Sequence, residues 1–211
     1  MITVDWFYDV ISPFAYFQQE RFALIPKSVT IVPRPVVLGA ILDTLSTKGP
    51  ADIPTKRTFI YRIAQQRAVE RGVPFKTPPA HPFNPIRTLR LAVALGQTVD
   101  TMRTIMRFIW AEGGDVNSPE GWTDLCSRLG VDPKDESFFA SDAAKAGLRA
   151  NSDLANTLGV FGVPTFHLNG ELFWGDDATG LFLSYLADPD LFKEGEWARI
   201  STLPAAIMRK L

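Results

Sequence analysis

The sequence predicts an α/β protein in which a block of helices interrupts the part of the chain that forms a β-sheet. Three observations lead to this prediction. Residues 2–33 alternate strand, helix and strand, helical periodicity fills the middle of the chain, and a hairpin signal follows it. The 211 residues are 46% hydrophobic and 21% charged, which is typical of a globular protein with a buried core.

The chain opens with a predicted βαβ unit. Residues 2–8 and 29–33 are rich in β-branched and aromatic side chains, as strands are, and residues 13–25 between them are compatible with a helix. Ser12 and Pro13 stand where this helix should begin. Serine is favoured as the capping residue and proline in the first turn, so the pair marks the helix start.

The middle of the chain, residues 39–158, reads as helical throughout. The first long helix is predicted over residues 54–71, and Gly72 supplies its C-terminal stop. Further helices are predicted from Asn84-Pro85 to Gly96 and over residues 98–112, 119–129 and 142–158.

The strand signal returns in residues 163–175, with Asn169-Gly170 as the turn of a hairpin, because both positions tolerate positive φ. A helix over residues 177–187 follows. This order predicts a thioredoxin-like domain, residues 1–38 plus 159–187, with an inserted all-helical domain, residues 39–158. Residues 188–211 form a C-terminal tail that the pattern leaves irregular.

Composition excludes several classes of function. The 22 basic and 23 acidic residues give a net charge of −1, which favours neither nucleic acid nor a membrane surface as a partner. Cys126 is the only cysteine, which excludes an internal disulfide, a Cys-x-x-Cys pair and a cysteine-rich zinc site. With only two histidines we expect no metal, and with no membrane span or basic leader we expect a cytoplasmic protein.

The start of the first helix carries the chemistry in a thioredoxin fold, where the usual order is Cys-Pro-x-Cys. Here the four places read Ser12-Pro13-Phe14-Ala15. Without either sulfur, dithiol exchange is impossible. A hydroxyl beside the positive end of a helix favours a thiolate that a ligand brings in.

Five segments, taken in order, resemble one family: FYDVISPFAY (7–16), RPVVLGA (34–40), PADIPTKR (50–57), HPFNPIRTLRLA (81–92) and GVFGVPTFHLNGELFWGDD (159–177). The chain resembles the glutathione-dependent 2-hydroxychromene-2-carboxylate isomerases, in the DsbA-like branch of the thioredoxin superfamily beside the kappa-class glutathione transferases. The resemblance implies glutathione as cofactor, a small aromatic-derived substrate and a homodimer. It also implies a reaction in aromatic compound catabolism, in which reversible thiolate addition opens a ring and permits cis–trans isomerisation.

The resemblance also implies roles for individual residues. Ser12 would hydrogen-bond the glutathione sulfur, and the Val163 backbone would pair with the cysteinyl unit ahead of a cis Pro164. Lys56 would reach the glycyl carboxylate. The γ-glutamyl end would lie near Trp174, Gly175, Asp176 and Asp177. The substrate residues would be Thr47, Lys48 and Asn84.

Three family positions differ here. Asp43 replaces a lysine and Thr47 an asparagine, and these changes affect the identity of the substrate, while Ala178 stands where family members often have arginine. The same motifs also fit a kappa-like glutathione transferase or a non-catalytic thioredoxin-fold module that binds peptides. Simpler structural roles also remain open. Ser12 could act only as a helix cap, Asp176 and Asp177 as acids at a helix start, and Lys56 as a solvated side chain.

Overall fold

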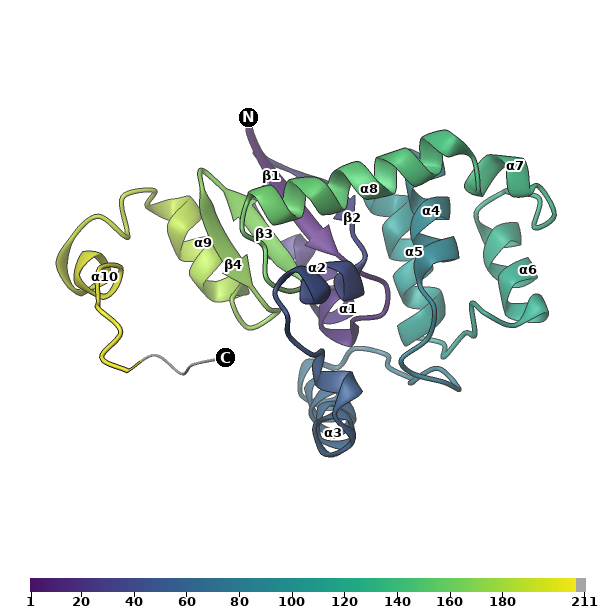
Figure 1. The fold of residues 1–211 in the computed structure, drawn as a ribbon, viewed down its shortest axis with the longest axis horizontal. Coiled ribbons are helices and arrows are strands. Elements are labelled where there is room, and N and C mark those ends of the chain that lie inside the picture. Colours follow the sequence, from purple (N-terminus) through teal and green to yellow (C-terminus); the bar gives the residue numbers. More distant parts are fainter. Residues whose placement is uncertain (208–211) are drawn as a thin grey trace.

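The computed structural model describes residues 1–207. Their strands form one four-stranded sheet in the order β2-β1-β3-β4. Strand β1 pairs in parallel with β2 and antiparallel with β3, and β3 pairs antiparallel with β4 (Figure 1). The strands are β1 (Ile2–Tyr8), β2 (Val29–Pro35), β3 (Thr165–Leu168) and β4 (Glu171–Trp174). Among these residues no helix combines the length and the apolar character that crossing a membrane requires.

The hairpin predicted around Asn169-Gly170 is confirmed. Both residues have positive φ, 53° and 87°, and Leu168 pairs with Glu171 across the two-residue turn. The hairpin brings Trp174, at the end of β4, opposite Thr165, at the start of β3. Trp174 and Thr165 are therefore neighbours in the sheet although nine positions separate them in the sequence.

The two faces of the central strand β1 belong to two different hydrophobic clusters. Val4, Trp6 and Tyr8 lie in the larger cluster, whereas Phe7 lies in the smaller one. Alternate side chains of a strand point to opposite faces, so β1 is covered on both sides. The larger cluster is built with α1 (Pro13–Gln19), α4 (Ile86–Ala94), α5 (Val99–Trp110), α6 (Pro119–Arg128) and α9 (Thr179–Ala187).

The smaller cluster joins the helical insertion to the sheet. Phe7 packs there with Ile41 of α2 (Leu38–Thr44), Ala155 of α8 (Asp142–Thr157) and Val163. Figure 1 shows α2 and α8 on the near side of the sheet. The helical segment therefore contributes side chains to both clusters, and the domain boundaries at residues 38/39 and 158/159 stay a prediction.

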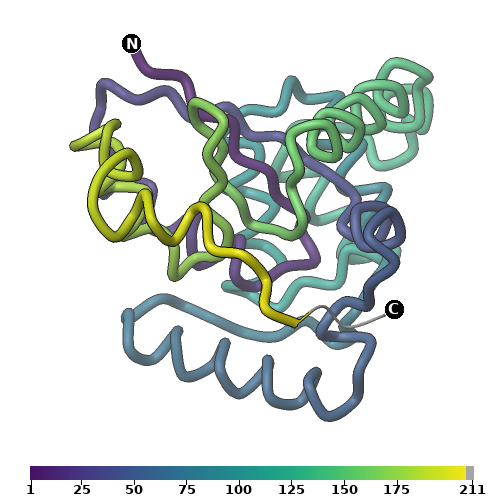
Figure 2. Tube along the Cα trace, turned by 60° about the vertical axis from the view of Figure 1, so that its left-hand side comes forward, coloured from purple at the N-terminus to yellow at the C-terminus, as the bar shows by residue number. Residues whose placement is uncertain are grey.

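Helix α3 (Pro54–Arg71) has the bounds that the sequence predicts, and Gly72 ends it with φ 61°. Only Ala64 and Ala68 are buried along its length. Figures 1 and 2 show α3 along the lower edge of the molecule, so the contacts that it makes with the body come from a few side chains. The remaining short helices are η1 (Phe22–Leu24), η2 (Pro50–Asp52) and α7 (Glu136–Phe139).

Two details near the C-terminus differ from the prediction. Helix α9 begins at Thr179, two residues after the predicted start. The residues before it form a turn after β4, in which Ala178 N–H donates to Gly175 C=O. The sequence predicts an irregular tail, but the structure contains α10 (Gly195–Ile200), whose Trp197 packs against Phe192 with ring centroids 5.5 Å apart. Residues 208–211 of the predicted tail lie outside the described residues.

Candidate active site

Ser12 caps α1, as the sequence predicts. Its Oγ accepts a hydrogen bond from Ala15 N–H at 3.3 Å, and Pro13 occupies the first turn. The residue is only 7% exposed. Because Oγ acts as an acceptor here and its own proton has no acceptor among residues 1–207, the hydroxyl keeps a donor for a ligand.

The loop between β1 and α1 is tied down by the buried side chain of Asp9. One carboxylate oxygen accepts from Ile11 N–H at 3.0 Å, and the other accepts from Leu38 N–H at 2.9 Å. The backbone oxygen of Asp9 accepts from Ser12 N–H at 3.1 Å. One residue thus connects the end of β1, the loop that carries Ser12 and the start of α2.

The stability of the fold should depend on the protonation of Asp9. Burial raises the pKa of Asp9 from 3.8 to about 7, against the opposing effect of the Leu38 and Ile11 N–H groups. Between these values the folded state keeps a proton that the unfolded state releases. Asp9 should therefore lower the free energy of unfolding as pH rises from about 4 to about 7, by up to about 1.4 kcal/mol per pH unit.

Urea denaturation of the wild type and of Asp9→Asn across this pH range measures the effect. The difference between the two curves should slope in this direction, because asparagine does not titrate. A difference that stays constant from pH 4 to pH 7 would contradict the raised pKa.

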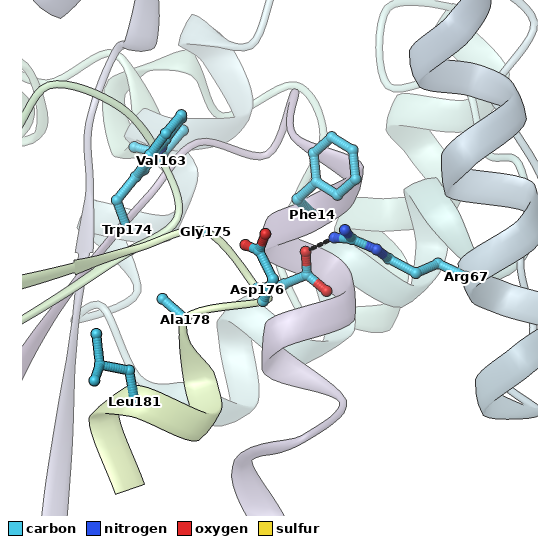
Figure 3. Close-up of a pocket in the computed structure, with 9 residues that line it drawn as sticks. Phe14, Arg67, Val163, Trp174, Gly175, Asp176, Ala178 and Leu181 are labelled. Carbon is cyan, nitrogen blue, oxygen red and sulfur yellow. Dashed lines mark hydrogen bonds and ion pairs between the residues drawn. The ribbon is translucent and has the colours of Figure 1, made fainter. Parts of the chain in front are cut away.

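A pocket of about 500 Å³ opens between α1, α3 and the end of the hairpin (Figure 3). The peptide bond between Val163 and Pro164 is cis, as the resemblance implies. The pocket brings together five of the predicted site residues, namely Val163, Trp174, Gly175, Asp176 and Asp177. Ser12 does not line it, but Phe14, two residues further along α1, does.

The two predicted acids differ in their surroundings. Asp176 is 1% exposed, and its carboxylate pairs with Arg67 and Arg71 of α3, the second at 2.6 Å. Figure 3 shows Arg67 reaching across the pocket to it. Arg21 Nη1 donates to the Asp176 backbone oxygen at 3.2 Å. Asp177 is exposed, so its carboxylate remains the one of the two that a ligand can reach.

Trp174 of the pocket lining forms an exposed aromatic pair with Phe161. Trp174 is 53% exposed, and its ring contacts that of Phe161 edge to face with centroids 5.1 Å apart. A Cβ at Gly162 would lie 2.6 Å from the indole nitrogen, so only glycine lets the ring settle over this backbone. The indole therefore has a defined position at the rim of the pocket.

Besides Ser12 and Pro164, four further predicted residues lie outside the pocket lining. These are Lys56, Thr47, Lys48 and Asn84, and all four are exposed. Lys56 is about three turns before Arg67 on α3, which places both on the same face of that helix. The roles assigned to these four residues stay predictions.

Four residues that line the pocket are not among the predicted site residues, namely Phe14, Arg67, Ala178 and Leu181. Phe14 and Arg67 are in cation–π contact, with the guanidinium carbon 5.0 Å from the ring centroid. Arg67 comes from the helical insertion and Leu181 from α9, so only the folded arrangement brings them together.

The chain is similar to several known proteins. A family model described as "DSBA-like thioredoxin domain" matches residues 3–187. A 2-hydroxychromene-2-carboxylate isomerase from Pseudomonas sp. (strain C18) is 25% identical over 183 residues, covering 84% of this chain and 86% of its own. Glutathione S-transferase kappa 2 from Caenorhabditis elegans is 27% identical over 209 residues, covering 88% and 92%.

A solved structure supports the architecture. The structure of a 2-hydroxychromene-2-carboxylate isomerase superposes with a TM-score of 0.73 at 23% identity, covering 95% of this chain and 100% of its own. At this identity the likeness concerns the fold alone. Together with the family model it confirms the fold class predicted from the sequence, an α/β thioredoxin-like arrangement with many added helices.

Proposed function

Because the chain belongs to the family of DsbA-like thioredoxin domains, we propose that it is a glutathione-dependent isomerase of the 2-hydroxychromene-2-carboxylate type. Its curated relatives are isomerases and glutathione transferases, which supports an enzyme. One observation carries the proposal beyond the family. A serine with a free O–H stands where dithiol enzymes of this fold carry a cysteine, two residues before Phe14 of the pocket lining, and Val163 of the same lining precedes a cis-proline.

The chemistry of the pocket fits glutathione. Val163 makes no backbone hydrogen bond among the described residues, so its N–H and C=O can pair with an extended peptide unit. The γ-glutamyl end carries an ammonium and a carboxylate, and the pocket offers both complements, the Asp177 carboxylate and the Arg67 guanidinium. Trp174 and Leu181 supply apolar wall between these polar groups.

The predicted contact of Lys56 agrees with the length of the ligand. About three turns of α3 separate Lys56 from Arg67, or about 16 Å of helix axis. A tripeptide spans about 11 Å when extended. The long side chain of Lys56 covers the remaining distance, so a peptide held at its γ-glutamyl end by Arg67 can meet Lys56 with its glycyl carboxylate.

Each residue then has one task. When bound, glutathione supplies the sulfur nucleophile that the chain itself lacks. Ser12 donates its hydroxyl hydrogen bond to the negatively charged sulfur and holds it in the ionised state at neutral pH. Val163 orients the cysteinyl unit, and Trp174 with Phe161 forms an aromatic surface at the rim for a planar ring. Because the nucleophile is returned, Ser12 positions it and is not itself consumed.

Titration with reduced glutathione in a calorimeter tests the cofactor. The wild type should bind it, and Lys56→Ala should bind it more weakly while turnover by the saturated enzyme changes less. Equal affinities would remove Lys56 from the site. No binding to the wild type would contradict the proposal and favour the peptide-binding module.

The mass of the product distinguishes isomerase from transferase. An isomer leaves the substrate mass unchanged, whereas a conjugate contains glutathione. The kappa-class relative, at 27% identity and 88% coverage of this chain, makes the transferase the second candidate. Because Asp43 and Thr47 depart from the family pattern, the assay should include neutral as well as carboxylated ring compounds.

The same proposal includes a cytoplasmic homodimer that acts in aromatic compound catabolism. Light scattering at several protein concentrations tests the dimer, which should show twice the 23.4 kDa chain mass. A mass that stays at that of one chain would remove this part of the proposal and leave the chemistry at Ser12 unaffected.

A further inference from the structure

Two aromatic rings from the helical insertion hold the backbone just before Ser12. Trp110 Nε1–H of α5 donates to Val10 C=O at 2.9 Å. His81 Nε2 lies 2.8 Å from Ile11 C=O. The two rings contact each other, with centroids 5.4 Å apart. The consecutive carbonyls of Val10 and Ile11 are therefore held by two side chains that pack together.

His81 is itself fixed by its neighbours. The hydroxyl of Tyr61, on α3, donates to the His81 backbone oxygen at 2.7 Å and lies 3.0 Å from its Nδ1. The ring of Phe83 packs edge to face on the imidazole with centroids 6.0 Å apart. The ring therefore has little freedom to turn away from Ile11.

These contacts determine the tautomer of His81. Burial lowers the pKa of His81, the charge of Arg57 lowers it further, and the bond to Ile11 opposes both. A neutral imidazole has a single N–H, and a carbonyl oxygen can only accept, so the proton must be on Nε2. Nδ1 is then an acceptor that faces the Tyr61 hydroxyl.

We propose that His81 is a positioning residue for Ser12, an inference that rests on the proposed function. The C=O of Ile11 and the N–H of Ser12 belong to the same planar peptide group. His81 holds the oxygen of this group, and the Asp9 backbone oxygen holds its N–H at 3.1 Å. With both ends fixed, the peptide plane sets the direction in which the Ser12 side chain leaves the backbone.

Three variants separate positioning from packing. His81→Leu removes the donor to Ile11, His81→Gln keeps an N–H donor near the same place, and Tyr61→Phe removes the neighbouring hydroxyl without touching the bond to Ile11. Three properties are measured in each: hydrogen exchange of the Ser12 amide without ligand, the thiol pKa of bound glutathione from thiolate absorbance, and kcat at neutral pH.

In His81→Leu the Ser12 amide should exchange about tenfold faster, and the pKa of the bound thiol should rise by about one unit. In the same variant kcat should fall about tenfold at neutral pH, with the affinity for glutathione nearly unchanged. His81→Gln should restore all three properties toward the wild type, and Tyr61→Phe should resemble His81→Gln.

The inference is overturned if His81→Leu leaves amide exchange or the thiol pKa unchanged, or if His81→Gln is impaired as much as His81→Leu. Failure of the proposed function gives a different result. The wild type then does not bind glutathione, while amide exchange in the ligand-free protein still decides whether His81 holds the Ser12 peptide.

Discussion

Ser12→Ala is expected to raise the pKa of the bound glutathione thiol by about one to two units and to lower turnover at pH 7 about tenfold. The hydrogen bond from a hydroxyl to a charged sulfur is worth about 1.5–3 kcal/mol, and one pKa unit corresponds to about 1.4 kcal/mol. A free thiol, with a pKa of about 8.5, is mostly protonated at pH 7. Thiolate absorbance against pH, followed in the presence of glutathione, measures the shift.

A second serine in the chain provides the control for Ser12. Ser141 caps α8 in the same way, since its Oγ accepts from Ala144 N–H at 3.1 Å. Ser141→Ala should lose about 1 kcal/mol of stability, as any lost cap does, and keep both turnover and the thiol pKa. Ser12→Ala with unchanged turnover and an unchanged titration would leave Ser12 as a helix cap only.

Asp176→Asn is expected to cost about 2–4 kcal/mol of folding stability. The Asp176 carboxylate is buried and pairs with Arg67 and Arg71, while Arg21 reaches its backbone oxygen. Without its charge the arginines would repel one another, and the charges of Arg21 and Arg67 already add to burial in lowering the pKa of Arg71. The loss should be below the about 3–5 kcal/mol of a fully buried pair, because the arginine side chains are about a quarter exposed.

The neighbouring acid is the matched control for Asp176. Asp177→Asn changes an exposed carboxylate, so stability should stay within about 0.5 kcal/mol of the wild type while glutathione binding weakens. Chemical denaturation and calorimetry on both variants give the comparison. If the two variants lost equal stability, or if Asp176→Asn lost none, the pairing of Asp176 with α3 would not support the fold.

Local signals made most of the fold predictable. Pro54 and Gly72 bound α3 because proline suits a first turn and glycine tolerates the left-handed end, and Asn169-Gly170 fixes the hairpin for a similar reason. Helix α10 was missed because a helix of six residues is too short for a periodic pattern. Its contact with Phe192 depends on packing that the sequence does not encode locally.

The candidate site was predictable only in part. Ser12 and cis Pro164 follow motifs at fixed places, so the sequence located them. The different environments of Asp176 and Asp177 could not be foreseen, because two adjacent acids look alike until the arginines of α3 come into contact with one of them. The contact of His81 with Ile11 has no local signal either, because 70 positions of sequence separate the two residues.

Val163 belongs both to the pocket wall and to the smaller hydrophobic cluster, where its neighbours include Val160 and Ala155 of α8. Val163, on which a bound peptide would rest, is therefore held in place by α8, a helix outside the pocket. A larger side chain in place of Ala155 would displace Val163 from the side opposite the pocket. It would therefore alter ligand affinity without contacting the ligand. Substitutions on α8, outside the pocket, can therefore change what the pocket binds.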